Sequence, residues 1–216
     1  LSQYDKAIQY YRLSLSMFPS SSPLKTRTLD SASCYENIGV SYLKKADFNQ
    51  SLAFSQAALQ MRIRALGTEN LSVADSYANI GSILKEMADY EGALFYQESA
   101  LALRLKSAAD NQADIASSYH NIGNIYLIKG EYNKAIEFYH YALGIKISLY
   151  GPENVRTSST YTSLANAYNQ KNEQLKAINF YNKSLKIRKD AVGEQSTDVA
   201  TLYNNLGLSY LDLPDT

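Results

Sequence analysis

The chain has 216 residues, 45% of them hydrophobic, and its 21 basic residues are balanced by 21 acidic residues. Without a basic excess the chain lacks the charge that neutralises a phosphate backbone, so we expect no nucleic-acid partner. No apolar run approaches the roughly 18 to 20 residues that cross a bilayer, and no signal peptide is recognisable, so we expect no membrane partner and a cytoplasmic location. Cys34 is the only cysteine, which excludes an internal disulfide and favours a reducing compartment.

The first predicted element is a helix over residues 3–18, followed by the stretch FPSSSPLK. Pro19 and Pro23 predict a break there, because proline lacks the amide hydrogen that a helix interior needs. Ala7 and Ser51 hold equivalent places in successive copies of a repeat, and they lie further apart than the equivalent residues of the later copies. The first connection is therefore predicted to be longer than the others.

After this break one pattern returns along the rest of the chain, and a small residue marks it. The small residue recurs with a constant period of 42, at Gly39, Gly81, Gly123, Ala165 and Gly207. Such a period is typical of arrays in which each unit buries its apolar face against its neighbours. We predict an all-α solenoid, one array cut from a larger protein. Its full repeats are at 31–69, 70–111, 112–153 and 154–195, and its half-repeats are at 1–18 and 196–213.

Each repeat is predicted to be a pair of amphipathic helices. In the third copy, apolar residues recur at steps of three and four on both sides of a break at Lys129-Gly130. The same break returns at Lys45-Ala46, Ala88 and Lys171-Asn172. An acidic residue follows every break, at Asp47, Asp89, Glu131 and Glu173. An acid at a helix start suits the helix dipole, so these residues are predicted to begin the second helices.

Small side chains are predicted to let the two helices of a pair approach closely, with aromatic side chains filling the flanks. In the third copy the small residues are Gly123, Ala135 and Ala142. The aromatic residues expected to pack around them are Tyr119, Tyr126, Tyr132 and Tyr139. We interpret this tyrosine stripe as core rather than as a binding surface.

The second helices are predicted to end alike. Gly67, Gly151 and Gly193 fit left-handed caps, with Ala109 at the remaining place. Basic residues fill the last turns before these caps, at Arg62, Arg64, Arg104, Lys106, Lys146, Lys186, Arg188 and Lys189. We interpret them as a solvated set that complements the helix dipole, the alternative being a patch that binds an anion.

These helix pairs resemble the tetratricopeptide repeat, whose usual period is about 34 residues. The period of 42 and the stretches YANIG, YNNLG, RIRALGTEN and GPENV look like the repeats of the kinesin light chain and of many bacterial multi-repeat proteins. The resemblance implies a right-handed superhelix of antiparallel helix pairs. It also implies that the first helix of each pair lines a concave groove.

The groove is where the resemblance places a peptide partner. Two residues before each small residue lies a polar row: Asn37, Asn79, Asn121, Ser163 and Asn205. An asparagine can satisfy both the N–H and the C=O of an extended peptide, as the matching residue does in peptide-binding relatives. The alternative is that these residues bond to the neighbouring helix and fix the geometry between repeats. Further candidates for the groove are Ser82, Lys85, His120, Asn124, Asn166, Asn169 and Asn204.

Other kinds of site are not predicted. Receptors for chaperone tails place basic residues on the groove helices, whereas this chain has Asp75, Ser117, Ser159 and Thr201 at those places. Cargo binding of the kinesin-light-chain type also depends on basic groove residues, and only Lys85 is an obvious counterpart. His120 and His140 lack a cysteine or acid at ligand spacing, so we expect no metal site. No phosphate-binding loop or nucleophile motif occurs, so we expect no cofactor and no enzymatic activity.

Three classes of function remain open at this point. The chain is predicted to be an adaptor that holds a peptide or helix of a partner protein in its groove. Alternatively, it is a regulatory array attached to an effector domain outside this sequence. A third class is weak self-association through the half-repeats, because an unpaired helix around Tyr203, Leu206 and Tyr210 would leave apolar surface open.

Overall fold

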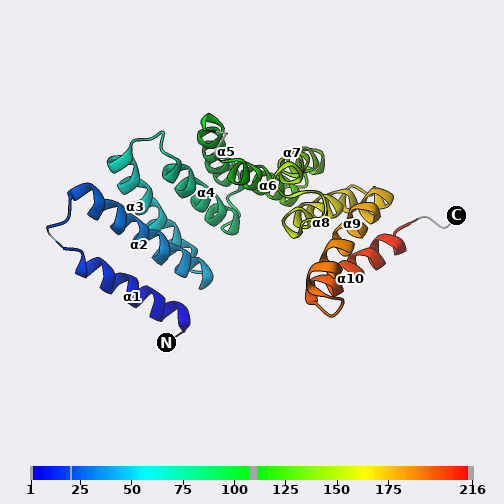
Figure 1. Cartoon of the computed structure of the whole chain (residues 1–216), viewed down its shortest axis with the longest axis horizontal. Coiled ribbons are helices and arrows are strands. Elements are labelled where there is room, and N and C mark those ends of the chain that lie inside the picture. The colour runs from blue at the N-terminus through cyan, green and yellow to red at the C-terminus, as the bar shows by residue number, and fades with distance from the viewer. Residues whose placement is uncertain (1, 20, 108–110, 214–216) are drawn as a thin grey trace. The chain divides into compact units, whose positions relative to one another are not determined.

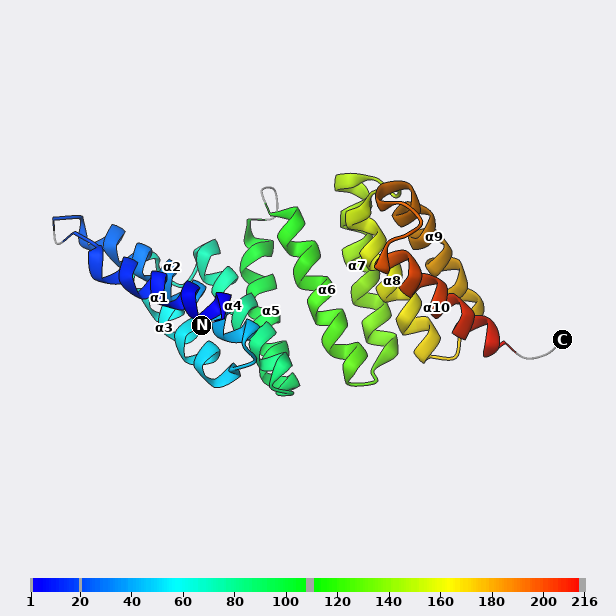
Figure 2. The same cartoon turned by 90° about the horizontal axis from the view of Figure 1, so that it is seen from below.

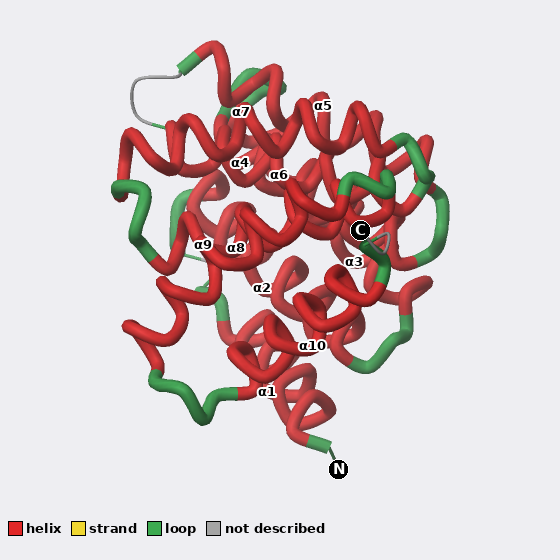
Figure 3. The backbone as a smooth tube through the Cα atoms, turned by 90° about the vertical axis from the view of Figure 1, so that its right-hand side faces the viewer, coloured by secondary structure: helices red, strands yellow, loops and turns green. Residues whose placement is uncertain are grey.

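The structure is a computed structural model that describes residues 2–19, 21–107 and 111–213, and every regular element in these ranges is an α-helix (Figures 1 and 3). The helices are α1 (Gln3–Met17), α2 (Leu24–Lys44), α3 (Phe48–Leu66), α4 (Leu71–Glu86), α5 (Tyr90–Lys106), α6 (Gln112–Ile128), α7 (Tyr132–Tyr150), α8 (Val155–Gln170), α9 (Gln174–Val192) and α10 (Thr197–Leu211). Among them, none is both long enough and apolar enough to cross a membrane.

The chain divides into two compact units, Leu1–Ser107 and Ala108–Thr216. In the first unit α2 pairs with α3 and α4 with α5, while α1 packs on α2 and α3 packs on α4. In the second unit α6 pairs with α7 and α8 with α9, while α7 packs on α8 and α9 packs on α10 (Figure 2). Each unit is therefore a stack of helix pairs, and the predicted all-α repeat solenoid is confirmed.

The turns inside the helix pairs lie at the predicted breaks. Ala46, Ala88, Gly130 and Asn172 have φ angles of 58°, 61°, 76° and 60°, which end the first helix of each pair. The amide after each of them donates to a carbonyl of the last helical turn, as from Asp47 N–H to Tyr42 O. The Asp47 side chain then accepts from the amide of Gln50 and starts α3. The acids therefore begin the second helices, as predicted.

The connections between helix pairs differ in one respect from the prediction. Gly67, Gly151 and Gly193 have positive φ angles of 80°, 86° and 81°, but their ψ angles are extended, at 170°, 162° and 167°. This conformation is not the left-handed helical cap that we predicted, and it is almost restricted to glycine. The predicted counterpart Ala109 lies outside the described residues.

The first connection is reorganised around its two prolines. Residues 24–30, which precede the predicted first repeat, belong to α2, so this helix has 21 residues whereas α4 has 16. Pro23 is the residue before its first turn, where a proline needs no hydrogen-bond donor. The longer spacing between Ala7 and Ser51 is thus absorbed by a longer helix start.

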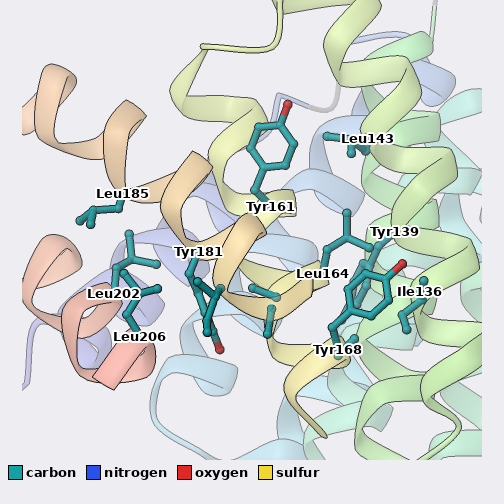
Figure 4. Packing of buried hydrophobic residues seen from close by; sticks show 14 of the residues in the cluster. Ile136, Tyr139, Leu143, Tyr161, Leu164, Tyr168, Tyr181, Leu185, Leu202 and Leu206 are labelled. Atoms are coloured by element: carbon teal, nitrogen blue, oxygen red, sulfur yellow. The ribbon is translucent and has the colours of Figure 1, made fainter. Parts of the chain in front are cut away.

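The core of each pair is built on the predicted small residues. Ala135 and Ala142 are fully buried, and a Cβ at Gly123 would lie 2.7 Å from the Tyr139 ring. Tyr139 belongs to the core of the second unit, together with residues of α8, α9 and α10 (Figure 4). Of the four predicted tyrosines only Tyr139 is fully buried, and the other three are half-buried.

Helix α10 is the last described helix, and no further described helix covers one of its faces. A Cβ at Gly207 of α10 would meet nothing within 4 Å, although Gly207 is in register with the tightly packed Gly123. Tyr203 and Tyr210 on the same helix are 49% and 56% exposed. Two of the three residues predicted for this surface are therefore open, whereas Leu206 is only 7% exposed because it packs into the core of the second unit. Self-association through it stays a prediction.

Candidate functional site

The predicted polar row lies at one register on the first helices of the pairs. Asn37 is on α2, Asn79 on α4, Asn121 on α6, Ser163 on α8 and Asn205 on α10. Asn37 is exposed and the other four are half-buried. We call the surface that carries this row the first-helix face, one on each unit.

Asn79 is engaged within the fold. Its side-chain amide donates to Glu36 Oε1 over 2.8 Å, which links α4 to α2 in the neighbouring repeat. Glu36 is 6% exposed and also accepts from Arg62 over 2.8 Å. Burial raises the pKa of Glu36 above its ordinary value, although Arg62 and Asn79 both favour the charged form. These contacts match the alternative in which the asparagine fixes the geometry between repeats.

Three further asparagines hold hydroxyl groups of their own unit. Asn124 Oδ1 accepts from Tyr139 Oη at 2.8 Å and Asn166 Oδ1 accepts from Tyr181 Oη at 2.5 Å. Asn169 Oδ1 accepts from Ser209 Oγ at 3.2 Å. In each case the amide oxygen is used and the amide nitrogen has no side-chain partner in the described ranges. These residues position core tyrosines or a neighbouring helix first, and only their NH₂ groups are left for a ligand.

The remaining asparagines of the row have both the C=O and the NH₂ of the side-chain amide available. Across residues 2–19, 21–107 and 111–213, the side chains of Asn37, Asn121 and Asn205 make no hydrogen bond. Lys85, the only basic residue among the predicted sites, forms an ion pair of 2.9 Å with the adjacent Glu86. The row is therefore of two kinds. Asn79 and Ser163 are engaged between helices, Ser163 with His120 Nε2 at 3.4 Å, and the three other residues have available amides.

The structure corrects our interpretation of the basic residues near the second-helix ends. Four of them, which we call the inward basic row, are in register and turn into the fold: Arg62, Arg104, Lys146 and Arg188. The side chains of Arg62, Arg104 and Arg188 are only 14%, 8% and 22% exposed. For these four residues, the prediction of a solvated set that complements the helix dipole is wrong. Their regular spacing was visible in the sequence, but it does not show burial.

Each arginine of the inward basic row pairs with a carboxylate on a first helix. Arg62 lies 2.8 Å from Glu36, Arg104 2.7 Å from Asp75 and Arg188 2.6 Å from Asp198. A buried guanidinium needs such partners, because an unpaired charge in the interior is costly. The carboxylates of Glu36, Asp75 and Asp198 on the first helices thus have a structural role, since each pairs with an arginine of the inward basic row.

Lys146 is the exception in the row. Its ammonium donates to Thr160 Oγ1 over 2.9 Å, and none of the described carboxylates forms an ion pair with it. Burial lowers the pKa of the Lys146 ammonium. His120 lies beside it, and its buried Nδ1 has no hydrogen-bond partner among the described residues. Burial, and to a lesser extent the Lys146 charge, lowers the pKa of His120 to about 4.

The low pKa of His120 predicts a stability that depends on pH. The unfolded chain binds a proton on this imidazole near its ordinary pKa of 6.5, whereas the folded chain does so only near 4. Stability is therefore lost as pH falls through this window, by about 3 kcal/mol at most. Urea denaturation across the window is expected to give a flatter profile for His120→Gln than for the wild type. Equal slopes for the two proteins would contradict a neutral, buried imidazole.

No group of three metal-ligating side chains occurs within the described residues. Paired helices in register, with a polar row along the first helices, define a repeat scaffold. Proteins of this class serve protein–protein interaction. The family model of the tetratricopeptide repeat matches residues 30–106 and 114–190, and the chain belongs to this family.

Solved structures agree with this assignment at the level of the fold. BtubC (BKLC) from P. vanneervenii superposes with a TM-score of 0.78 at 18% identity, covering 98% of this chain and 82% of that one. The apo form of RapI gives 0.76 at 20% identity, covering 97% and 77%. The "kinesin light chain nearly identical TPR-like repeats" of Podosopora anserina give 0.69 at 14% identity, covering 90% of each chain. The predicted resemblance to repeats of the kinesin-light-chain type is confirmed. No curated protein matches the chain.

Proposed function

We propose that this chain is a protein-binding scaffold whose first-helix face holds an extended segment of a partner protein. The observation that carries the proposal is the pair of available amides on the second unit, Asn121 on α6 and Asn205 on α10. Each presents one acceptor and two donors at the same register, as the backbone of an extended peptide requires. Asn37 on α2 offers the same groups on the first unit.

The asparagines that bond within the fold have a structural role on this face. Asn79 holds α4 to α2, and Asn124 and Asn166 hold buried tyrosines, so their oxygens are not offered to a ligand. Their role is to keep the first helices in place. A partner segment on the second unit would then contact Asn121 and Asn205 directly, with the amide nitrogens of Asn124, Asn166 and Asn169 as further donors. On the first unit the equivalent contact would be Asn37. Lys85, paired with Glu86, contributes a cation at the edge of the first unit.

The proposal includes a cytoplasmic setting and no cofactor. Cys34 is a free thiol and is buried, which suits a reducing compartment. The balance of 21 basic and 21 acidic residues favours a peptide over a nucleic acid as the partner.

The test uses peptides selected from a random-sequence library for binding to the wild-type chain. Replacing Asn121 and Asn205 together by Ala removes two peptide-backbone contacts, each worth about 0.5 to 1.5 kcal/mol. Affinity measured by calorimetry is expected to fall by about one to two orders of magnitude. Because neither side chain is bonded within the described fold, the melting temperature is expected to change little.

The matched control is Asn133→Ala with Asn182→Ala. Both residues are exposed asparagines on second helices, α7 and α9. This pair is expected to leave binding intact. Equal losses in the two double variants, or none in either, would show that the selected peptides bind elsewhere.

A further inference from the structure

The first unit has a pocket where the end of α1, the start of α2 and the end of α3 meet (Figure 1). Its volume of about 620 Å³ lies in the range of sites that hold small molecules. Part of the lining is apolar, contributed by Leu15, Phe18, Leu24 and Met61. The pocket can therefore shield an apolar group from water.

The rest of the lining carries positive charge that nothing in the described fold balances. Lys25, Arg27 and Arg64 all line the pocket, and their side chains form no ion pair or hydrogen bond across the described ranges. None of the lining residues is acidic, and Asp30, the acid of α2 closest to Arg27 in sequence, is not among them. Three cations around one pocket raise the local positive potential, which favours an anion there.

The start of α2 adds to this preference. Leu24 and Lys25, the first two residues of this 21-residue helix, line the pocket. Pro23 precedes them as the N-cap residue, and no side chain caps the helix. The first-turn amides of a helix have no partner within it, and the helix dipole is positive at this end. A helix start with nearby arginines is a suitable environment for a phosphate group.

The second repeat shows how the same positions are balanced elsewhere in the chain. Arg27 and Arg64 correspond, one repeat period later, to Glu69 and Lys106. Glu69 and Lys106 form an ion pair of 2.5 Å. In the first repeat an arginine stands at the position of the acid, so both members of the pair are positive.

A second pocket, of about 690 Å³ at the start of α8, gives the same comparison. It is lined by Glu153, which lies three repeat periods after Arg27, and by Lys186. These two residues form an ion pair of 2.7 Å. The pocket at the start of α2 thus differs from the one at the start of α8, because it lacks an internal anion at this register.

We propose that the pocket at the start of α2 binds a small phosphate monoester that carries an apolar group. The phosphate lies at Arg27, Arg64 and the start of α2, and the apolar group lies against Leu15, Phe18 and Met61. Arginine matches phosphate oxygens in pairs, and the double negative charge of a monoester suits three cations better than a carboxylate does. None of the lining residues belongs to the polar row, so the site is independent of the proposed scaffold function.

The probe is phenyl phosphate, titrated into the chain and followed by calorimetry at about pH 8, where it is a dianion. Phenyl sulfate keeps the ring but has a single charge, and inorganic phosphate lacks the ring. We expect phenyl phosphate to bind at one site, and each control to bind about tenfold more weakly or worse. Absence of saturable binding, or equal affinity for phenyl phosphate and either control, would overturn the proposal.

Charge reversal within the pocket provides the sharper test. Arg27→Glu restores the arrangement of Glu69 and Lys106, so the new carboxylate is expected to pair with Arg64 and to lower the affinity at least about tenfold. The matched control is Lys44→Glu, an exposed lysine in the last turn of the same helix, which is expected to preserve binding. Equal losses in the two variants would show unspecific attraction to positive charge and would reject the site.

Two further arms keep the proposal open to contradiction. Arg64→Gln leaves α2 unchanged and is expected to lower the affinity about tenfold, so unchanged binding by this variant would contradict the proposal even if Arg27→Glu fails to fold. Acetyl-Gly-phosphotyrosine-Gly-amide carries the same phenyl phosphate group on a peptide. Binding of this peptide more than about tenfold tighter than phenyl phosphate would reject a small molecule as the ligand in favour of a phosphorylated protein segment.

Discussion

Replacing Glu36 by Ala is expected to lower the free energy of unfolding by about 3 to 5 kcal/mol. The substitution leaves the guanidinium of Arg62, whose side chain is 14% exposed, without its carboxylate partner. It also removes the acceptor of the Asn79 amide, which lies on the next first helix. Since one carboxylate serves both neighbours, the contact between α2 and α4 is expected to weaken with the pair. Urea denaturation followed by circular dichroism measures the loss.

Two control variants separate the cost of leaving Arg62 unpaired from the cost of losing an ion pair at the surface. Combining Glu36→Leu with Arg62→Met removes both charges, and it is expected to restore most of the stability, because a buried pair replaced by apolar side chains is often neutral. Glu153→Ala breaks the exposed pair with Lys186 and is expected to leave the stability nearly unchanged, because solvent screens the pair. A loss in Glu36→Ala no larger than in Glu153→Ala would show that the pair is not an internal one.

Gly123→Leu is expected to destabilise the second unit by about 3 kcal/mol, at the upper end of the cost of overpacking. Even a Cβ at this position would lie 2.7 Å from Cε1 of Tyr139 and 3.3 Å from the carbonyl of Ala135. Tyr139 cannot move aside easily, because it is fully buried and its hydroxyl donates to Asn124. The two helices α6 and α7 must therefore separate to admit a leucine. Thermal melts of the variant provide the measurement.

Gly207→Leu is the matched control, because Gly207 is in register with Gly123 but meets nothing within 4 Å. This variant is expected to be at least as stable as the wild type, since glycine is a poor helix former. Equal losses at the two positions would contradict the close packing of α6 on α7. Stability lost only at Gly123 would support it.

The helix pairs and their core could be predicted because they depend on nearby residues and on a strict period. Apolar residues at steps of three and four place both helices of a pair, and the break between them follows from Lys129-Gly130 and its counterparts. The small residue at position 123 predicts a close approach of the two helices of the pair, even when the residue that faces it is not known. The exact partner, the Tyr139 ring, is also within the same repeat.

The candidate site could be predicted only in part, because its contacts join residues that are far apart in sequence. The available amide of Asn121 and the engaged amide of Asn79 look identical in the sequence, and only the neighbouring Glu36 distinguishes them. The sequence predicts solvated last-turn cations for the inward basic row, since the repeat period alone does not tell which side of a helix is covered. The missing partner of Lys146 follows from a comparison of repeats, once Glu36 is known to pair with Arg62.

The position of a bound peptide on the chain tests the proposed scaffold function most directly. A peptide selected on the wild type is added to ¹⁵N-labelled protein, and the side-chain NH₂ signals of the asparagines are followed by NMR. A peptide held on the first-helix face is expected to give large shifts for Asn121 and Asn205 on the first helices, and none for Asn133 and Asn182 on the second helices. Shifts at Asn133 and Asn182 with unchanged signals from Asn121 and Asn205 would contradict it.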